Sequence, residues 1–323
     1  MEKRMSKYLL LTFLFCFVLL VFSQQNFSLS EAEKFLENRE YAKAREILLK
    51  LHNQDDQNAR INFLLGSIVL RENKYDDAID YLDAAIEVEE NNPEYYNMLG
   101  NAYGVKAQNS GMIKAMFAVP KMKSNWEKAL ELKPDYLEPK QSLFQFYLRA
   151  PGIAGGDNDK AVQLAQEILK QDEALGHRLM GFYWEAENDL AKAENELLKS
   201  YSIDSENISL INHMGYFYLR QNNPQKGYPF FKRQIKLAAH TANVYDSMGD
   251  YFAKVEQYDS ALVYFEKALQ KESSYIPSRF NRGLMLEKLG KKDDAKNIYK
   301  QIVEEMPDNR YGKQAEDRLD ELE

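Results

Sequence analysis

The 323-residue sequence predicts an all-α fold in which antiparallel pairs of helices stack into a solenoid that ends in a capping helix. Two observations predict this fold. An apolar residue followed by glycine recurs at a spacing of 34 residues. Between these glycines, apolar residues recur three and four apart, as in a helix with one buried stripe. The apolar fraction of 45% is ordinary for a folded protein, so disorder is not expected.

The recurring glycine marks the first helix of each pair. The glycines of the period are Gly66, Gly100, Gly181, Gly215, Gly249 and Gly283. A small residue recurs twelve positions after the glycine and a large one sixteen after it, as in Ala261 and Phe265. The small residues allow two helix axes to approach, and the large ones fill the space between one pair and the next. Stacking of neighbouring pairs therefore supplies the core.

These positions together resemble the tetratricopeptide repeat over nearly all of residues 27–323. The resemblance implies a right-handed superhelical solenoid with a concave groove. We predict eight repeats within residues 24–323, followed by a charged capping helix at 310–322. Their approximate ranges are 27–58, 59–92, 93–136 with an insertion, 137–173 with an insertion, 174–207, 208–241, 242–275 and 276–309.

Residues 1–23 predict a secretory signal peptide. Three cations among the first seven residues precede an apolar run at 8–22. This run is shorter than the ~20 residues of a comfortable bilayer span. We expect cleavage between Ser23 and Gln24 and export, with the periplasm of a Gram-negative bacterium as the expected compartment. An uncleaved N-terminal anchor is the alternative, and only then is a membrane an expected partner.

Charge and cysteine content exclude some classes of partner and of chemical site. The net charge is −8 and becomes −10 without residues 1–23, which argues against nucleic acid and against an anionic membrane surface as the main partner. The single cysteine, Cys16, lies in the predicted signal, so the mature chain has no thiol for a disulfide, a metal site or a nucleophile.

No motif of a catalytic or metal site is present. The four histidines, His52, His177, His213 and His240, form no H-E-x-x-H pattern, and there is no G-x-S-x-G. His177 and His213 lie on first helices of neighbouring repeats and could approach one another. We expect a non-catalytic protein without metal or cofactor.

The first insertion, between Tyr103 and Trp126, must lengthen a helix or add one. Its apolar residues fall at helical spacing among lysines, and methionine and phenylalanine suit an adaptable partner surface. Inward packing against neighbouring helices is the simpler interpretation. The candidate contacts in this insertion are Lys106, Gln108, Met112, Met116 and Phe117.

The second insertion, residues 149–160, is rich in proline and glycine. It lacks the spacing of a phosphate-binding loop, and Val162 and Ile168 stand where a calcium loop starting at Asp157 needs glycine and glutamate. We expect a flexible turn in which Asn158 or Asp159 caps the next helix. The motifs Y-G-x-K-A-Q at 103–108 and A-P-G-x-x-G-G at 150–156 resemble a subgroup of exported bacterial tetratricopeptide repeat proteins.

In this family the concave groove is lined by the first helices, chiefly at set positions that include the fifth, ninth and thirteenth of the repeat. Amides there suit a peptide backbone or a sugar, and aromatic rings offer rigid contact area. Cations at the thirteenth position either form a row that binds an acidic partner, or simply stabilise the last turn of the helix by offsetting its dipole. The candidate groove residues are Phe63, Ser67, Arg71, Asn97, Asn101, Gln141, Gln145, Arg149, Arg178, Phe182, Asn212, Tyr216 and Arg220.

The sequence therefore predicts an exported scaffold that binds a protein or peptide segment in its concave groove. Two alternatives stay open. One is a binding protein for a non-protein ligand such as a glycan, and the other is an accessory subunit of an envelope enzyme or assembly complex.

Overall fold

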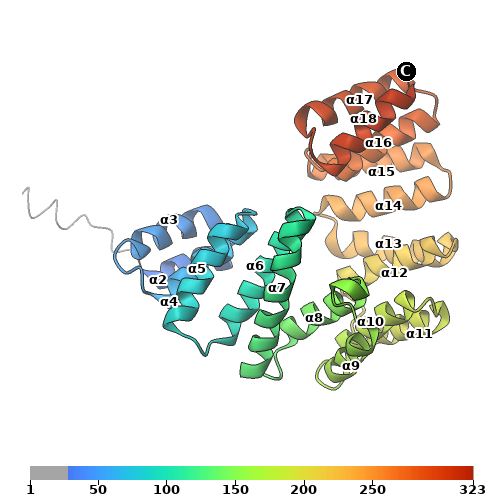
Figure 1. Ribbon diagram of the computed structural model, residues 1–323. Helices are drawn as coiled ribbons and strands as arrows, with labels where there is room; N and C mark the ends of the chain where they lie inside the picture. The colour runs from blue at the N-terminus through green and yellow to red at the C-terminus, as the bar shows by residue number, and fades with distance from the viewer. Residues whose placement is uncertain (1–27, 323) are drawn as a thin grey trace, which may run out of the picture. The chain divides into compact units, whose positions relative to one another are not determined.

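The computed structural model describes residues 28–322, and every regular element in this range is helical (Figure 1). These residues form seventeen α-helices and one short 3-10 helix. The predicted all-α fold is confirmed. The predicted signal peptide lies outside the described residues.

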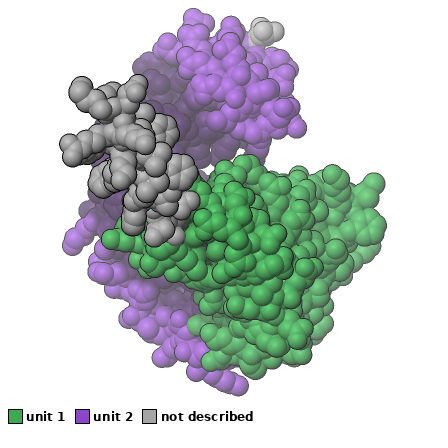
Figure 2. Space-filling model, turned by 90° about the vertical axis from the view of Figure 1, so that its left-hand side faces the viewer, with its two compact units in different colours: residues 1–164 green, residues 165–323 purple. Residues whose placement is uncertain are grey.

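The chain divides into two compact units, residues 1–164 and 165–323 (Figure 2). In the N-terminal unit each helix from α2 to α8 packs against the next one along the chain. The helices are α2 (Leu29–Glu37), α3 (Tyr41–His52), α4 (Ala59–Arg71), α5 (Tyr75–Val88), α6 (Pro93–Asn109), α7 (Met112–Leu132) and α8 (Leu137–Arg149), followed by the 3-10 helix η1 (Gly152–Ala154) and by α9 (Asn158–Leu169), which crosses the boundary.

The C-terminal unit repeats the same arrangement of packed neighbours. Its helices are α10 (Glu173–Ala186), α11 (Leu190–Ile203), α12 (Ile208–Arg220), α13 (Pro224–Ala238), α14 (Ala242–Lys254), α15 (Tyr258–Lys271), α16 (Ile276–Lys288), α17 (Lys292–Glu305) and α18 (Arg310–Leu322). The last helix, α18, packs on α17 and α16 and buries Gly312 and Ala315 against them.

The turn inside a helix pair is made by asparagine in three repeats. Asn73, Asn188 and Asn222 adopt positive φ angles of 60°, 58° and 56°. This left-handed conformation is disfavoured for most L-residues, but the short polar side chain of asparagine tolerates it. Asparagine also starts helices, since Oδ1 of Asn207 accepts a hydrogen bond of 3.0 Å from the backbone N–H of Leu210.

The glycine of each repeat lies directly against the large residue sixteen positions later. A Cβ atom on Gly215 would lie 2.6 Å from Phe231, and one on Gly100 would lie 2.5 Å from Trp126. Phe231 is fully buried. The large residue therefore packs onto the glycine of its own helix pair, whereas the sequence predicted that it fills the space between one pair and the next. In the third repeat the insertion separates the two positions further, and Trp126 is the residue that packs onto the glycine.

The first insertion lengthens both helices of its pair. The helices α6 and α7 have 17 and 21 residues, whereas α4 and α5 have 13 and 14. The link between α6 and α7 is only Ser110 and Gly111. The predicted lengthening is confirmed.

The second insertion forms a fixed turn through backbone hydrogen bonds. Gly155 has a φ of 97°, and the N–H of Gly156 donates to the carbonyl of Pro151 at 3.1 Å. The cap of α9 was predicted as Asn158 or Asp159, which is wrong. Oδ1 of Asp157 accepts from the backbone N–H of Lys160 at 3.1 Å, because α9 already begins at Asn158.

Candidate functional site

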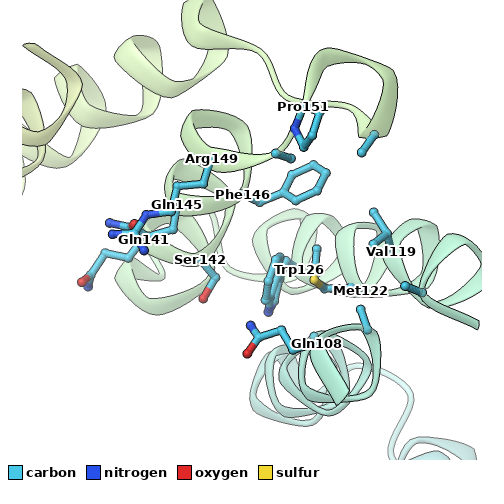
Figure 3. Close-up of a pocket in the computed structure, with 15 residues that line it drawn as sticks. Gln108, Val119, Met122, Trp126, Gln141, Ser142, Gln145, Phe146, Arg149 and Pro151 are labelled. Atoms are coloured by element: carbon cyan, nitrogen blue, oxygen red, sulfur yellow. The ribbon is translucent and has the colours of Figure 1, made fainter. Parts of the chain in front are cut away.

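The two insertions meet at one cavity in the N-terminal unit (Figure 3). We call this cavity the insertion pocket; its volume is about 640 Å³, within the range of small-molecule and side-chain binding sites. Its walls are α6, α7, α8 and the turn that contains η1. The lining residues are Gly104, Ala107, Gln108, Ala115, Val119, Met122, Trp126, Gln141, Ser142, Gln145, Phe146, Arg149, Ala150, Pro151 and Ala154.

The centre of the insertion pocket is apolar. Trp126, Met122 and Val119 enter it from α7, and Phe146 enters from α8 (Figure 3). The indole Nε1 of Trp126 donates a hydrogen bond of 3.0 Å to Oδ1 of Asn101, which fixes the ring. The pocket therefore offers a rigid aromatic wall with its polar atom already satisfied.

Polar groups line one edge of the insertion pocket. Gln141, Gln145 and Arg149 occur every fourth residue on α8, so they share one helix face. Gln108 on α6 is exposed. Within residues 28–322 none of these four side chains has a hydrogen-bond or ion-pair partner in the protein, so their groups are free to bind a ligand.

The apolar residues at the start of α7 do not pack inward, so the simpler interpretation of the sequence is wrong. Met112, Ile113, Met116 and Phe117 are 89%, 73%, 64% and 67% exposed. We call these four residues the apolar tip. The other helices beside this pair, α5 and α8, have only 14 and 13 residues, and among the described residues the first turns of α7 stay exposed.

Lys106, the remaining candidate of the first insertion, has a partner in the protein. Its Nζ lies 2.6 Å from Oδ1 of Asp76 on α5, and this hydrogen bond raises the pKa of Lys106. Lys106 therefore joins α6 to α5. Lys121 is also engaged, since its Nζ lies 5.2 Å from the centre of the Tyr103 ring.

The predicted groove residues of the second and third repeats contribute to packing. Asn97 is 7% exposed and donates to the hydroxyl of Tyr136 at 3.4 Å, while Asn101 holds Trp126. Phe63 is almost fully buried, with its ring centre 4.9 Å from that of Tyr95.

Two further groove candidates of the second repeat are also engaged. The hydroxyl of Ser67 donates to the carbonyl of Phe63 at 2.9 Å. The guanidinium of Arg71 lies 4.9 Å from the centre of the Tyr41 ring. Ser67 is therefore bonded within its own helix, whereas Arg71 is exposed and contacts only the face of an aromatic ring.

The groove candidates of α10 and α12 also contact other groups of the protein. Arg178 donates to Asn207 at 3.4 Å, and Arg220 lies 2.7 Å from Glu185. The ring of Phe182 lies 4.5 Å from that of His213, whose Nε2 contacts Glu185. The two histidines that could have approached one another are paired separately, because His177 Nδ1 lies 2.6 Å from Glu196.

A hydrogen-bonded network joins α12, α14 and α16 in the C-terminal unit. The hydroxyl of Tyr216 donates to Asp250 at 2.6 Å, and the hydroxyl of Ser278 donates to Asp246 at 2.6 Å. Asn212 accepts from Ser247 at 3.0 Å. Asn212 and Tyr216 were predicted as open groove residues, but they connect adjacent first helices instead.

Of the two carboxyl groups of this network, that of Asp246 is buried and that of Asp250 is half-buried. Burial, followed by the charge of Asp250, raises the pKa of Asp246 to about 7. Burial also raises the pKa of Asp250. The sequence signal was available, since aspartates occupy both the fifth and the ninth positions of one repeat, one helical turn apart.

Family models identify the repeat. Models of the tetratricopeptide repeat match residues 35–102 and residues 278–309. These two stretches of the chain therefore match the tetratricopeptide repeat. Within this repeat array the insertion pocket lies at the repeats that depart most from the regular period.

Solved tetratricopeptide repeat structures share the fold. A tetratricopeptide repeat protein from Parabacteroides merdae ATCC 43184 is 14% identical with a TM-score of 0.60, over 80% of this chain and 96% of that chain. The APC/C hetero-tetramer Cut9-Hcn1 is 13% identical with a TM-score of 0.55, over 87% of this chain and 52% of that chain. At these identities the likeness shows the fold alone.

One curated relative is similar over a short stretch. The uncharacterized protein ycf37 of Guillardia theta is 40% identical over 81 residues, which are 25% of this chain. The match spans 44% of that protein, less than half its length. In the described part of this chain, no group of three or more His, Cys, Asp or Glu side chains could hold a metal ion. None of the helices within residues 28–322 is both long and apolar enough to cross a membrane.

Proposed function

We propose that this chain is an exported, non-catalytic scaffold that holds a segment of another protein in the insertion pocket. Tetratricopeptide repeats are in general protein-interaction scaffolds, which gives the coarse function. The observation that carries the finer proposal is the combination of an apolar cavity with free amides at its edge. An apolar centre holds a side chain, and amides both donate to and accept from a peptide backbone.

The choice of this pocket over the rest of the predicted groove rests on hydrogen bonding. Asn97, Asn101, Asn212 and Tyr216 already bond to protein groups. A ligand that used them would first have to break these bonds, each worth about 0.5–1.5 kcal/mol. Gln108, Gln141 and Gln145 carry no such cost. The same reasoning weakens a glycan site built on the asparagines and tyrosine of the middle repeats.

The test is affinity purification from the native host with a variant that fills the pocket. Ala115 lines the pocket on α7 and is half-buried, so Ala115→Phe places a ring in the cavity. The matched control is Ala191→Phe on α11, where the alanine is exposed. Circular dichroism checks that both variants fold. The proposal expects proteins recovered with wild type and control to be lost with Ala115→Phe; equal recovery with all three would refute it.

A further inference from the structure

The insertion pocket has one charged lining residue, and it is a cation. Of its fifteen lining residues only Arg149 is charged, and none is aspartate or glutamate. The adjoining stretch 104–123 contains four lysines and no acid, although the whole chain carries a net charge of −8. Lys114, in the first turn of α7, is exposed and has no acidic partner among the described residues. Lys106 and Lys123 are paired with Asp76 and Glu127, so the positive charge that lines the pocket itself is that of Arg149.

Arg149 has no carboxylate beside it, in contrast to three ion-paired arginines of this chain. Arg60 lies 2.9 Å from Glu33, Arg279 lies 2.5 Å from Glu305, and Arg318 contacts Glu287. Within residues 28–322 no aspartate or glutamate lies within ion-pair distance of Arg149. Its guanidinium lies with Gln141 and Gln145 at the edge of the pocket (Figure 3). A planar guanidinium has the geometry to bind a carboxylate with two hydrogen bonds.

We infer that the insertion pocket recognises an acidic protein segment through two adjacent features. A large apolar side chain of the segment enters the cavity between Trp126 and Phe146. A carboxylate within one or two residues of it pairs with Arg149, and the neighbouring peptide groups bond to Gln141 and Gln145. This inference rests on the proposed function and names the chemistry of its partner.

The position of Arg149 disfavours a basic segment. A lysine or arginine next to the apolar side chain would lie near the unpaired guanidinium of Arg149, and like charges at this range repel. The amides tolerate any peptide, since they are uncharged and bind backbone groups. Arg149 therefore sets the preference for acid, whereas the apolar cavity sets the requirement for a large side chain.

The experiment is selection from two random heptapeptide libraries displayed on phage, one with the peptide in mid-chain and one with a free C-terminus. The target is the purified full-length chain, either wild type, Arg149→Gln, Arg149→Lys or Ala115→Phe. Wild type is expected to enrich peptides in which a large apolar residue lies within two positions of Asp or Glu, or of the terminal carboxylate. Comparison of the two libraries shows which source of carboxylate the pocket takes.

The variants test the preference for an acidic segment separately from the proposed function, which is binding of any protein segment in the pocket. Arg149→Gln should lose the acidic preference and bind a selected acidic peptide about tenfold or more weakly, since hydrogen bonds to charged groups are the stronger ones. Arg149→Lys should retain the preference in part, and Ala115→Phe should enrich none of these peptides. If wild type enriches peptides without acid and Ala115→Phe still abolishes them, the inference is wrong and the proposed function stands. If Ala115→Phe enriches the same peptides as wild type, both are wrong.

Discussion

The indole Nε1 of Trp126 on α7 donates a hydrogen bond of 3.0 Å to Oδ1 of Asn101 on α6. This bond connects the packing of a repeat to its binding surface. The same ring lies against Gly100, at the place that the large residue occupies in regular repeats, and it forms the wall of the insertion pocket. The repeat core and the candidate site therefore share one side chain.

The first prediction concerns this bond. Asn101→Ala leaves the indole N–H of Trp126 without its partner, so the free energy of unfolding should fall by about 1–3 kcal/mol. Chemical denaturation followed by circular dichroism measures the change. Gln108→Ala on the same helix is the control, because Gln108 is exposed and unbonded, and it should stay within about 0.5 kcal/mol of wild type. Equal effects of the two substitutions would show that this hydrogen bond does not contribute to the free energy of unfolding.

The second prediction concerns the close approach of glycine and its large neighbour. Gly215→Ala places a methyl group 2.6 Å from the buried ring of Phe231. Overpacking of this kind costs about 1–3 kcal/mol. At Gly111 a Cβ would meet nothing within 4 Å, so Gly111→Ala serves as the comparison. Thermal melting should separate the two variants, and a Gly215→Ala protein as stable as Gly111→Ala would contradict the packing described here.

The third prediction is a pH dependence that arises at Asp246. Its native pKa is raised to about 7, so the native state holds this proton more tightly than the unfolded state. The stabilisation is fully present below about pH 4 and is lost as the pH rises through 7, by at most about 4 kcal/mol. The groups facing Asp246 are Asp250, Ser278 and Tyr275.

Asp246→Asn tests this directly, since asparagine keeps the acceptor for Ser278 without the charge. At pH 8 the variant should be more stable than wild type, and at pH 5 the difference should shrink or reverse. Urea denaturation at both pH values measures it. Asp259→Asn, at an exposed aspartate of α15, should show neither effect. A constant difference between Asp246→Asn and wild type at the two pH values would rule out the assignment.

The fourth prediction concerns the apolar tip. The triple variant Met112→Ser, Met116→Ser and Phe117→Ser should unfold at nearly the wild-type midpoint, because these side chains bury little surface in the folded chain. Its recovery of partner proteins in affinity purification should fall, since exposed apolar residues next to a pocket extend the contact area. Met122→Ser, at a buried residue two turns on, should instead lower the stability. Unchanged recovery with the triple variant would remove the tip from the interface.

The fifth prediction concerns export. Cells that express the full chain should contain, in the periplasmic fraction, a product whose first residue is Gln24. Mass spectrometry of the N-terminal peptide measures this. An uncleaved product that sediments with membranes would favour the N-terminal anchor, and a cytosolic product would refute export.

The regular repeats could be predicted from sequence because their packing is local. A glycine and a large residue sixteen positions apart, such as Gly215 and Phe231, report a contact within one helix pair. The helices of such a pair are adjacent in the chain, so periodicity alone gives both the fold and the core. In the third repeat the same reasoning identifies Trp126 as the large residue, shifted along the sequence by the insertion.

The candidate site could be predicted only in part. Both insertions were recognised, and Gln108, Gln141, Gln145 and Arg149 were named as contacts. That residues 104–126 and 150–154 converge on one cavity depends on how far α6 and α7 extend, which the sequence does not specify. For the apolar tip the sequence leaves both a partner surface and inward packing open, because helical spacing shows which residues share a face but not whether a neighbour covers it.

The prediction that the other groove residues are open to a ligand is wrong for a different reason. Family positions indicate where a side chain lies, but not which groups of the next repeat it meets. Asn101, Asn212 and Tyr216 occupy the expected helices and are bonded to Trp126, Ser247 and Asp250. Such contacts, within the third repeat for Asn101 and between repeats for Asn212 and Tyr216, become visible only in three dimensions.

The most direct test of the central claim is site-specific photo-cross-linking in living cells. A benzophenone amino acid replaces Gln145, at the edge of the insertion pocket, or Asp135, an exposed residue between α7 and α8 that does not line it. We predict a discrete cross-linked protein at position 145 that is absent at position 135 and absent at position 145 when Ala115→Phe is also present. The same cross-linked protein at position 145 with and without Ala115→Phe would contradict the account.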